Sequence, residues 1–372
     1  MAKGRAKPRH VKPVAVMAKG LPSVEPYAAL DLGTNSCRML IAQPRGSQFH
    51  VIDSFSKSVQ LGRGLEKHGT LSAASIRRTV DALKICRRKI DYHGVKNMRL
   101  VATEACRRAA NGEAFLRSVV SETGLELEII RPEEEAQLAV ISCAPLVSQR
   151  TEQLLVVDIG GGSTELVWID LSKVPPIDRA RAIMRMGRNF GAGAPDTPFA
   201  RAEVVDWISV PAGVATLTDM FRDVEDDSAR FALMSCHFEE FLDKFAPYRL
   251  AETPEIRPEF QIIGTSGTVT TVAATHLGLR RYDRSKVDGL RMTSDQVKSV
   301  VDQYLALGAE GRRQDPRIGR DRQALILSGV AILQTLMRIW PTDRLNVADR
   351  GLREGLLYAQ MSADGVLEDG PL

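Results

Sequence analysis

Cysteine and histidine are sparse in this chain, and neither occurs in a disulfide or metal-binding pattern. The 372 residues include five cysteines, none in a Cys-x-x-Cys pair, and six histidines that form no His-Glu-x-x-His motif. A secreted disulfide framework and a histidine-based metal site therefore have no support in the sequence. We expect reduced cysteines that line the core of a cytoplasmic protein.

Long apolar runs and a large net charge are also absent. The longest apolar stretch, residues 324–337, is too short to span a membrane and contains Gln334, so we predict a buried helix there and no membrane contact. The N-terminus has no apolar secretory segment, which also favours the cytoplasm.

Positive charge is concentrated at the N-terminus. The formal net charge is +4, and residues 1–26 hold six Lys or Arg and one Glu, so the rest of the chain is nearly neutral. We predict a basic disordered tail over residues 1–26, which is either a solubilising extension or an aid in holding a polyanion. The neutral body argues against sequence-specific nucleic-acid binding.

Two turns rich in small residues, each preceded by an aspartate, repeat in the chain. "ALDLGTNSCRMLIA" spans residues 29–42, "VVDIGGGSTELVW" spans residues 156–168, and Asp31 aligns with Asp158. A dinucleotide-binding loop does not fit, because a strand and not a helix follows the glycines, and a Walker A loop does not fit, because Gly-Lys is absent. An ordinary β-turn would explain either copy alone. The repeat instead predicts two hairpins in duplicated domains, with their turns facing each other across a cleft.

The composition of these turns indicates an anion site. Glycines and small hydroxyl residues leave backbone N–H groups free to bind phosphate oxygens. An aspartate beside each turn would repel phosphate unless a cation lay between them, so the pattern predicts a Mg²⁺–phosphate site. "IIGTSGT", residues 262–268, follows an apolar strand and precedes a helical stretch, which makes it a third candidate phosphate loop.

The order of the expected elements indicates a two-domain α/β architecture with mixed sheets. The same order of elements begins again at residue 154. An irregular basic insertion near residues 172–206 interrupts this second copy. The predicted domains are 27–150 and 151–372, the second with a helical C-terminal end. In the first half we predict strands at 27–31, 37–43, 48–60, 98–103 and 125–130, and helices at 72–92, 113–123 and from Pro132.

Two charged segments have both a structural and a chemical interpretation. "RPEEEAQLAV", residues 131–140, has the proline and glutamates that favour a helix start, yet a glutamate near a metal–phosphate site would deprotonate an attacking water. Arg107 and Arg108 are either surface side chains on a turn or a bidentate clamp on phosphoryl oxygens. The residues alone leave both pairs of alternatives open.

Together these motifs resemble the exopolyphosphatase and guanosine pentaphosphate phosphohydrolase family, within the actin, Hsp70 and sugar-kinase superfold. The resemblance implies two duplicated actin-like (ribonuclease H-like) domains whose mixed sheets face a central cleft. It covers about residues 27–361. The motifs that carry it are Asp31–Ser36, Ala102–Arg107 with Asn111, Glu134–Ala136, Asp158–Glu165, Ser209–Gly213, Gly264–Thr268 and Gly351–Gly355.

The resemblance also implies roles for single residues. Glu135 is expected to be the catalytic base, and Asp158 to help hold Mg²⁺ and position water, with Asp31 and Glu165 as further candidates for water-mediated metal contacts. Arg107 and the three turns are expected to bind the substrate's phosphates. The turn residues are Gly33, Thr34, Asn35, Ser36, Gly160, Gly161, Gly162, Ser163, Gly264, Thr265, Ser266, Gly267 and Thr268.

The chain departs from the family pattern in three places. Arg131-Pro132 stands where Ser-Gly is usual, Asp288-Gly289 stands where His-Gly is usual, and, since the sequence stops soon after Gly351–Gly355, we expect no extra C-terminal helical domain of the kind that longer members have. The first two changes remove no expected catalytic group but are expected to affect substrate choice. The third leads us to expect low processivity on long polyphosphate.

The expected function is that of a Mg²⁺-dependent exopolyphosphatase, which releases terminal orthophosphate from inorganic polyphosphate by water attack. The alternative with the same machinery is a guanosine pentaphosphate 5′-phosphohydrolase. An ATP-gated actin- or Hsp70-like binding protein and a sugar-kinase-like phosphotransferase are further alternatives on the same superfold. A homodimer is the default expectation for the assembly.

Overall fold

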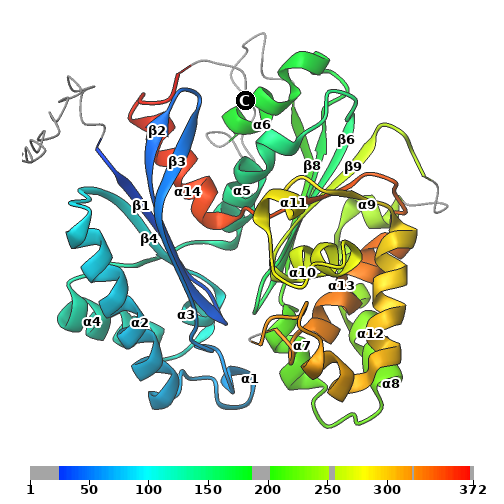
Figure 1. Ribbon diagram of the computed structural model, residues 1–372, viewed down its shortest axis with the longest axis horizontal. Coiled ribbons are helices and arrows are strands. Elements are labelled where there is room, and N and C mark those ends of the chain that lie inside the picture. Colours follow the sequence, from blue (N-terminus) through cyan, green and yellow to red (C-terminus); the bar gives the residue numbers. More distant parts are fainter. Residues whose placement is uncertain (1–24, 187–201, 251–255, 321, 369–372) are drawn as a thin grey trace, which may run out of the picture.

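Two mixed sheets, one in each half of the chain, form the framework of the molecule (Figure 1). The computed structural model describes residues 25–186, 202–250, 256–320 and 322–368. The first sheet has strand order β3-β2-β1-β4-β5, and the second has β10-β11-β9-β6-β7-β8. The strands are β1 (Tyr27–Leu32), β2 (Ser36–Arg45), β3 (Gln48–Ser58), β4 (Asn97–Ala102), β5 (Glu128–Ile129), β6 (Gln153–Ile159), β7 (Thr164–Asp170), β8 (Glu203–Val210), β9 (Phe260–Thr265), β10 (Arg291–Met292) and β11 (Leu345–Ala348).

The two sheets repeat one topology, as the duplicated motif predicts. β1 pairs antiparallel with β2 and parallel with β4, and β6 likewise pairs antiparallel with β7 and parallel with β9. Both predicted hairpins are therefore present. The register sets Arg38 opposite Asp31 in the first hairpin and Glu165 opposite Asp158 in the second.

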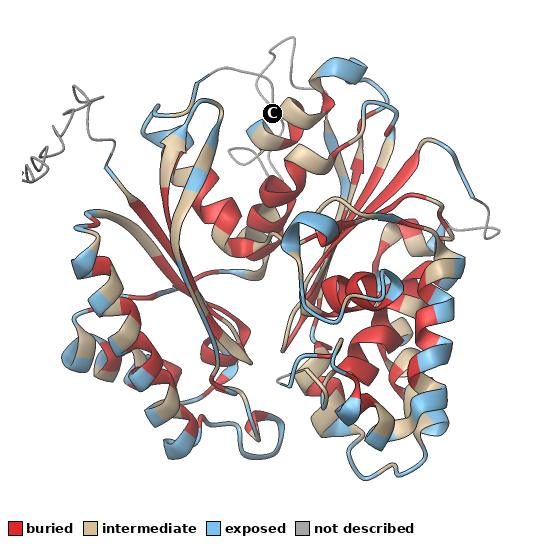
Figure 2. Ribbon diagram, viewed as in Figure 1, coloured by how far each residue is buried: buried red, intermediate tan, exposed pale blue. Residues whose placement is uncertain are grey.

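Helices cover the outer faces of the sheets and also fill the space between them. Figure 2 shows that central strands such as β1, β6 and β9 and the helix surfaces turned toward them are mostly buried, whereas β3 and the outward helix surfaces are intermediate or exposed. The α-helices of the described ranges are α1 (Leu65–His68), α2 (Ala73–Tyr92), α3 (Glu104–Arg108), α4 (Gly112–Thr123), α5 (Pro132–Cys143), α6 (Arg179–Arg185), α7 (Val214–Met220), α8 (Asp227–Glu240), α9 (Ala246–Arg249), α10 (Gly267–His276), α11 (Arg284–Val287), α12 (Ser294–Gln314), α13 (Ile326–Ile339) and α14 (Leu352–Ala363).

The predicted helix starts have identifiable local causes. The Ser72 side chain accepts the Ser75 N–H at 3.2 Å and so caps α2, which places Val80, Leu83 and Ile90 in the first core. α5 begins with Pro132 at its first turn, where a missing N–H costs nothing.

The last helix crosses back to the first half of the chain. α14 packs on α5 and on β1, and Figure 1 shows both helices between the two sheets. Leu356 and Tyr358 of α14 share a buried apolar cluster with Tyr27 and Leu40. The division at residue 150 stays a prediction, since α5 and α14 join the two sheets at this end.

Three local expectations need correction or fall outside the described residues. The irregular insertion near 172–206 is wrong in part, because it contains α6 and the start of β8; its residues 187–201, like residues 1–24 of the predicted tail, lie outside the described part. Cys236 is exposed, although the other four cysteines are buried and all are unpaired. No helix in the described ranges is long and apolar enough to cross a membrane.

Candidate active site

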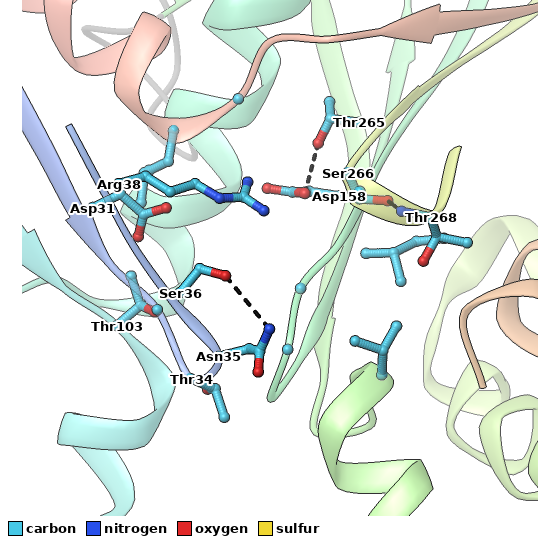
Figure 3. A pocket seen from close by; sticks show the side chains of 18 of the residues that line it. Asp31, Thr34, Asn35, Ser36, Arg38, Thr103, Asp158, Thr265, Ser266 and Thr268 are labelled. Atoms are coloured by element: carbon cyan, nitrogen blue, oxygen red, sulfur yellow. Dashed lines mark hydrogen bonds between the residues drawn. The ribbon is translucent and has the colours of Figure 1, made fainter. Parts of the chain in front are cut away.

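The three predicted turns meet at one cavity of about 250 Å³ between the sheets. Figure 3 shows side chains of the first turn on one side and those of Asp158 and the third turn on the other. Gly264, Arg107 and Glu165 do not line the cavity, whereas every other predicted site residue does. The lining members are Asp31, Gly33, Thr34, Asn35, Ser36, Glu135, Asp158, Gly160, Gly161, Gly162, Ser163, Thr265, Ser266, Gly267 and Thr268.

The turn after β1 is held from behind through its carbonyl oxygens. The Asn35 carbonyl accepts the N–H groups of Val59 and Gln60 at 2.9 Å, and the Thr34 carbonyl accepts the Gly62 N–H at 2.9 Å. The N–H groups of Thr34 and Asn35 donate to no described residue. The turn therefore presents free donors on the side away from its carbonyls, at the cavity.

The turn after β6 is held in the same way by the start of α7. Its glycine carbonyls accept N–H groups from residues 213–216 at 2.7–3.3 Å, while the N–H groups of Gly161 and Gly162 donate to no described residue. A Cβ on Gly213 would lie 2.5 Å from the carbonyl carbon of Gly161, so only glycine permits this approach. The two holding segments occupy equivalent places in the two halves. Residues 59–62 follow β3, and residues 213–216 follow β8.

The turn after β1 and the turn after β6 approach each other closely at the cavity. A Cβ on Gly162 would lie 2.6 Å from Thr34 Oγ1, and one on Gly161 would lie 3.2 Å from the Asn35 nitrogen. Thr34 is 8% exposed, and its Oγ1 has no hydrogen-bond partner among the described residues. A buried polar atom left unpaired beside free N–H groups marks a place for a polar ligand or water.

The third turn differs from the sequence expectation in its donors. Ser266 has φ 130°, outside the conformations that side chains usually allow, and its hydroxyl accepts the N–H groups of Thr268 (3.1 Å) and Val269 (3.3 Å). These two amides are thus used to cap α10, while the Gly267 N–H stays unpaired among the described residues. Gly264 lies within β9 and packs against Val269.

Hydroxyl groups orient the two carboxylates of the second hairpin. Thr265 donates to Asp158 at 2.6 Å (Figure 3), and Ser209 donates to Glu165 at 2.8 Å. Burial raises the pKa of Asp158 despite the Thr265 bond. Burial, together with the charge of Asp158, raises the pKa of Glu165 to about 7.

Arg38 faces these acids from the first hairpin. In Figure 3 its guanidinium extends from β2 toward Asp158. Arg38 and Arg353 both favour the ionised form of Asp31, yet burial still raises the pKa of Asp31 to about 6. Carboxylates of the cavity are thus incompletely compensated by the cations around them.

Comparison with known proteins places this geometry in a family. The sequence matches the Ppx/GppA phosphatase family over residues 40–364. The chain belongs to the Ppx/GppA phosphatase family. This confirms the resemblance drawn from the motifs.

The relatives of this chain carry two different enzyme names. It is 27% identical over 332 residues to the guanosine-5′-triphosphate,3′-diphosphate pyrophosphatase of Aeromonas salmonicida, covering 89% of this chain but 58% of that protein. It is 23% identical over 340 residues to a Haemophilus influenzae protein provisionally named an exopolyphosphatase, covering 91% of this chain and 92% of that protein. The chain thus spans a little over half the length of the Aeromonas relative.

A solved structure of the family supports the fold. The crystal structure of the Aquifex aeolicus member superposes with a TM-score of 0.69 at 30% identity, covering 92% of this chain and 99% of that one. The predicted fold class, mixed α/β sheets in duplicated actin-like halves, is confirmed.

In this Ppx/GppA chain, Glu135 forms one wall of the cavity and is tied to Arg107. Arg107 Nη2 lies 3.2 Å from Glu135 Oε2 and 2.7 Å from Glu104 Oε2, and Nη1 donates to the Ile130 carbonyl at 2.6 Å. Burial and the neighbouring Glu165 raise the pKa of Glu135 well above its usual range, whereas Arg107 lowers it. Arg107 therefore touches the expected base and not the cavity; its contact with phosphate stays a prediction.

Several cavity residues were missed from the sequence. No role was predicted for Arg38, Thr103, Glu104, Arg322, Asp349, Arg350 and Arg353, although Thr103, Glu104 and Arg353 lie within the motifs Ala102–Arg107 and Gly351–Gly355. Arg38 had a usable signal, because the alignment of Asp31 with Asp158 also sets Arg38 against Glu165. The remaining arginines come from the C-terminal third, and only the fold brings them to the turns.

Proposed function

We propose that this protein is a Mg²⁺-dependent exopolyphosphatase that removes terminal orthophosphate from inorganic polyphosphate. The observation that carries the proposal is the convergence of turns with unpaired backbone N–H groups on one cavity that also contains Glu135. Such turns bind phosphate oxygens without reading a base or a sugar. Arginines in the wall add charge complementary to a polyanion.

Glu135 is the general base of the proposed reaction. A base acts best when its pKa lies near the working pH, and burial moves the pKa of Glu135 upward in that direction. Glu135 takes a proton from water as the water oxygen bonds to the terminal phosphorus. The bridging P–O bond breaks, and the shortened chain leaves with its electron pair. Because the leaving group is a good one, positioning and charge stabilisation supply most of the acceleration.

The donor set fits a hard divalent cation such as Mg²⁺. Asp31 and Asp158 are partly buried carboxylates whose pKa values are raised by desolvation, so added positive charge would stabilise their ionised forms. No three Asp, Glu, His or Cys side chains of the described ranges are grouped closely enough to hold a metal alone. Mg²⁺ typically uses one or two carboxylates together with water and substrate phosphates. Asp158 and Asp31 would hold it, with Glu165 through water, and when bound it neutralises phosphate charge and polarises the phosphoryl group.

Guanosine pentaphosphate hydrolysis is the second candidate. It has support in the name of the Aeromonas relative, and it requires the same turns and the same base. Both substrates present a terminal phosphoanhydride, so the groups at the scissile bond do not separate them. The difference has to come from contacts to the remainder of the substrate.

The decisive experiment measures phosphate release by the purified full chain with Mg²⁺ from long-chain polyphosphate, guanosine pentaphosphate and ATP. Glu135→Gln is nearly isosteric and cannot accept the proton, so we expect normal folding, retained substrate binding and at least a hundredfold lower kcat. Preference for polyphosphate over guanosine pentaphosphate supports the leading function, and the reverse preference supports the second. Release from none of the three would favour an ATP-gated binding protein, and near-normal turnover by the variant would remove Glu135 from the base role.

The remaining sequence predictions accompany this proposal. They are the domain limits 27–150 and 151–372, a cytoplasmic location, and a homodimer. Fractionation of the native host and sedimentation of the full chain test the last two.

A further inference from the structure

The turn between β11 and α14 borders the cavity opposite the phosphate-binding turns of the hairpins. Asp349, Arg350 and Gly351 of this turn line the cavity. The segment 282–290 holds the turn from behind. Its Arg284 donates to the Asp349 carbonyl at 2.6 Å, and its Gly289 N–H donates to the Val347 carbonyl at 2.8 Å.

Asp288 is the central contact between that segment and the turn. Its Oδ1 accepts the Asp349 N–H at 3.1 Å, and its Oδ2 accepts Arg350 Nε at 3.1 Å and Nη2 at 2.9 Å. The carboxylate thus fixes both the backbone of the turn and one edge of the guanidinium. A bidentate pair of this kind holds the plane of the arginine side chain.

The other edge of the guanidinium is available. Arg350 Nη1 donates to no described residue, and the side chain is 23% exposed while that of Asp288 is 16% exposed. A guanidinium has five N–H donors in a fixed fork, so an edge not used by Asp288 points away from it. Since Arg350 lines the cavity, that edge is presented to whatever occupies the cavity.

We propose that Arg350, positioned by Asp288, binds a substrate phosphate other than the one cleaved, and that the pair thereby selects substrates with several linked phosphates. The inference rests on the proposed function and deepens it. The terminal phosphoryl has its own donors in the turns beside Glu135. A second phosphate held by Arg350 fixes the direction of the chain in the cavity and so distinguishes an oligophosphate from a single phosphoryl group.

The chemistry of Asp288 suits it to position Arg350. An aspartate can hold a guanidinium by two parallel hydrogen bonds, which a neutral imidazole with one donor and one acceptor cannot. The aspartate at position 288 therefore suits the arginine at position 350.

The test measures binding of inorganic tripolyphosphate in the presence of Mg²⁺ by isothermal titration calorimetry, on the full chain carrying Glu135→Gln so that no turnover occurs. In this parent, Arg350→Gln keeps a donor for Asp288 but loses the second edge and the charge. We expect its Kd to rise about tenfold, as for the loss of one charged hydrogen-bond pair. Arg350→Lys keeps the ion pair and should fall between the two, since an ammonium lacks the planar fork.

Arg291→Gln is the matched control. Arg291 pairs with Asp343 at 2.7 Å on the same sheet but does not line the cavity, so its Kd should equal that of the parent. Asp288→Asn should weaken binding in the parent and add nothing once Arg350→Gln is present, because it acts through Arg350.

A Kd for Arg350→Gln and Arg350→Lys within twofold of the parent would overturn the proposal and leave the pair a purely structural contact. The same holds if the parent itself does not bind tripolyphosphate. Phosphate release by the chain with native Glu135 tests the proposed function separately. Tight, Arg350-dependent binding without any hydrolysis would thus support the contact between Arg350 and a phosphate chain but reject the hydrolase.

Discussion

At the scale of single residues, the contact between Arg107 and Glu135 leads to a test of two roles for the arginine: lowering the pKa of Glu135, or binding the substrate directly. Arg107 lowers the pKa of Glu135, so Arg107→Met should raise that pKa and move the acidic limb of the kcat/KM profile to higher pH. A pH–rate profile of both proteins checks this, with Arg108→Met as the control, since Arg108 binds Glu66 at 2.6 Å, approaches Glu104 only at 3.7 Å and has no contact with Glu135. An unmoved limb with a raised KM would instead indicate direct contact with substrate.

The buried carboxylates predict an inverted pH dependence of stability. Folding raises the pKa of Asp31 from 3.8 to about 6 and that of Glu165 from 4.5 to about 7, so the folded state binds more protons than the unfolded state in this window. The free energy of unfolding therefore falls as pH rises from about 5 to 7. Without divalent cations we expect a Tm at pH 8 a few degrees below that at pH 5.5.

Mg²⁺ should reverse much of this difference, because a cation that binds the folded state favours the ionised carboxylates. Thermal unfolding at both pH values, with and without Mg²⁺, measures the effect. Glu165→Gln serves as the control and should reduce the dependence. A Tm that is equal or higher at pH 8 without metal would contradict the burial of these charges.

Single residues also show where sequence reasoning ends. Asp31 and Asp158 were found because a repeated local pattern contains both the acid and its turn. Arg107 was found too, and Glu104 is its local (i, i+3) neighbour on α3, but its contact with Glu135 joins α3 to α5, which no local pattern records. The arginines at 322, 350 and 353 belong to none of the three phosphate-binding turns. The fold of the second half brings them to the cavity.

At the scale of elements, the start of α7 decides whether the glycine turn after β6 keeps its shape. Gly213→Ala would place a methyl group 2.5 Å from a backbone carbon of Gly161, and backbone cannot yield as a side chain can. We expect a folded protein with a KM for polyphosphate at least tenfold higher, because the displaced turn no longer directs its N–H groups at the substrate. Gly319→Ala, where a Cβ would meet nothing within 4 Å, is the control. Steady-state kinetics of both variants, with their circular dichroism spectra, test the expectation.

Element prediction succeeded where local chemistry was strong. Ser72 and Pro132 correctly predicted the starts of two helices. The apolar runs before each glycine turn correctly predicted the first strands of the two hairpins. α6 was missed because its segment also holds the glycines and prolines that suggested an irregular insertion. β5 was predicted too long, since only Glu128 and Ile129 pair with β4 while its flanking apolar residues pack against helices.

At the scale of the whole molecule, α14 decides whether the two halves unfold together. Leu356 is fully buried in a cluster that unites α14 with β1 and β2 of the first sheet, although α14 follows the second sheet in sequence. Leu356→Ala leaves a cavity there and should cost about 2–5 kcal/mol of unfolding free energy. Because α14 also packs on α5, which contacts the second sheet, the substitution should lower the stability of both sheets.

All three tryptophans, Trp168, Trp207 and Trp340, lie in the second half, so their fluorescence reports on that half while far-UV circular dichroism reports on both. In urea, Leu356→Ala should move the two transitions to lower denaturant together. Leu333→Ala, in the core of the second half, provides the comparison. If Leu356→Ala instead shifts only part of the dichroism transition and leaves the fluorescence midpoint unchanged, the halves unfold independently, as the predicted domains 27–150 and 151–372 would without the coupling through α14.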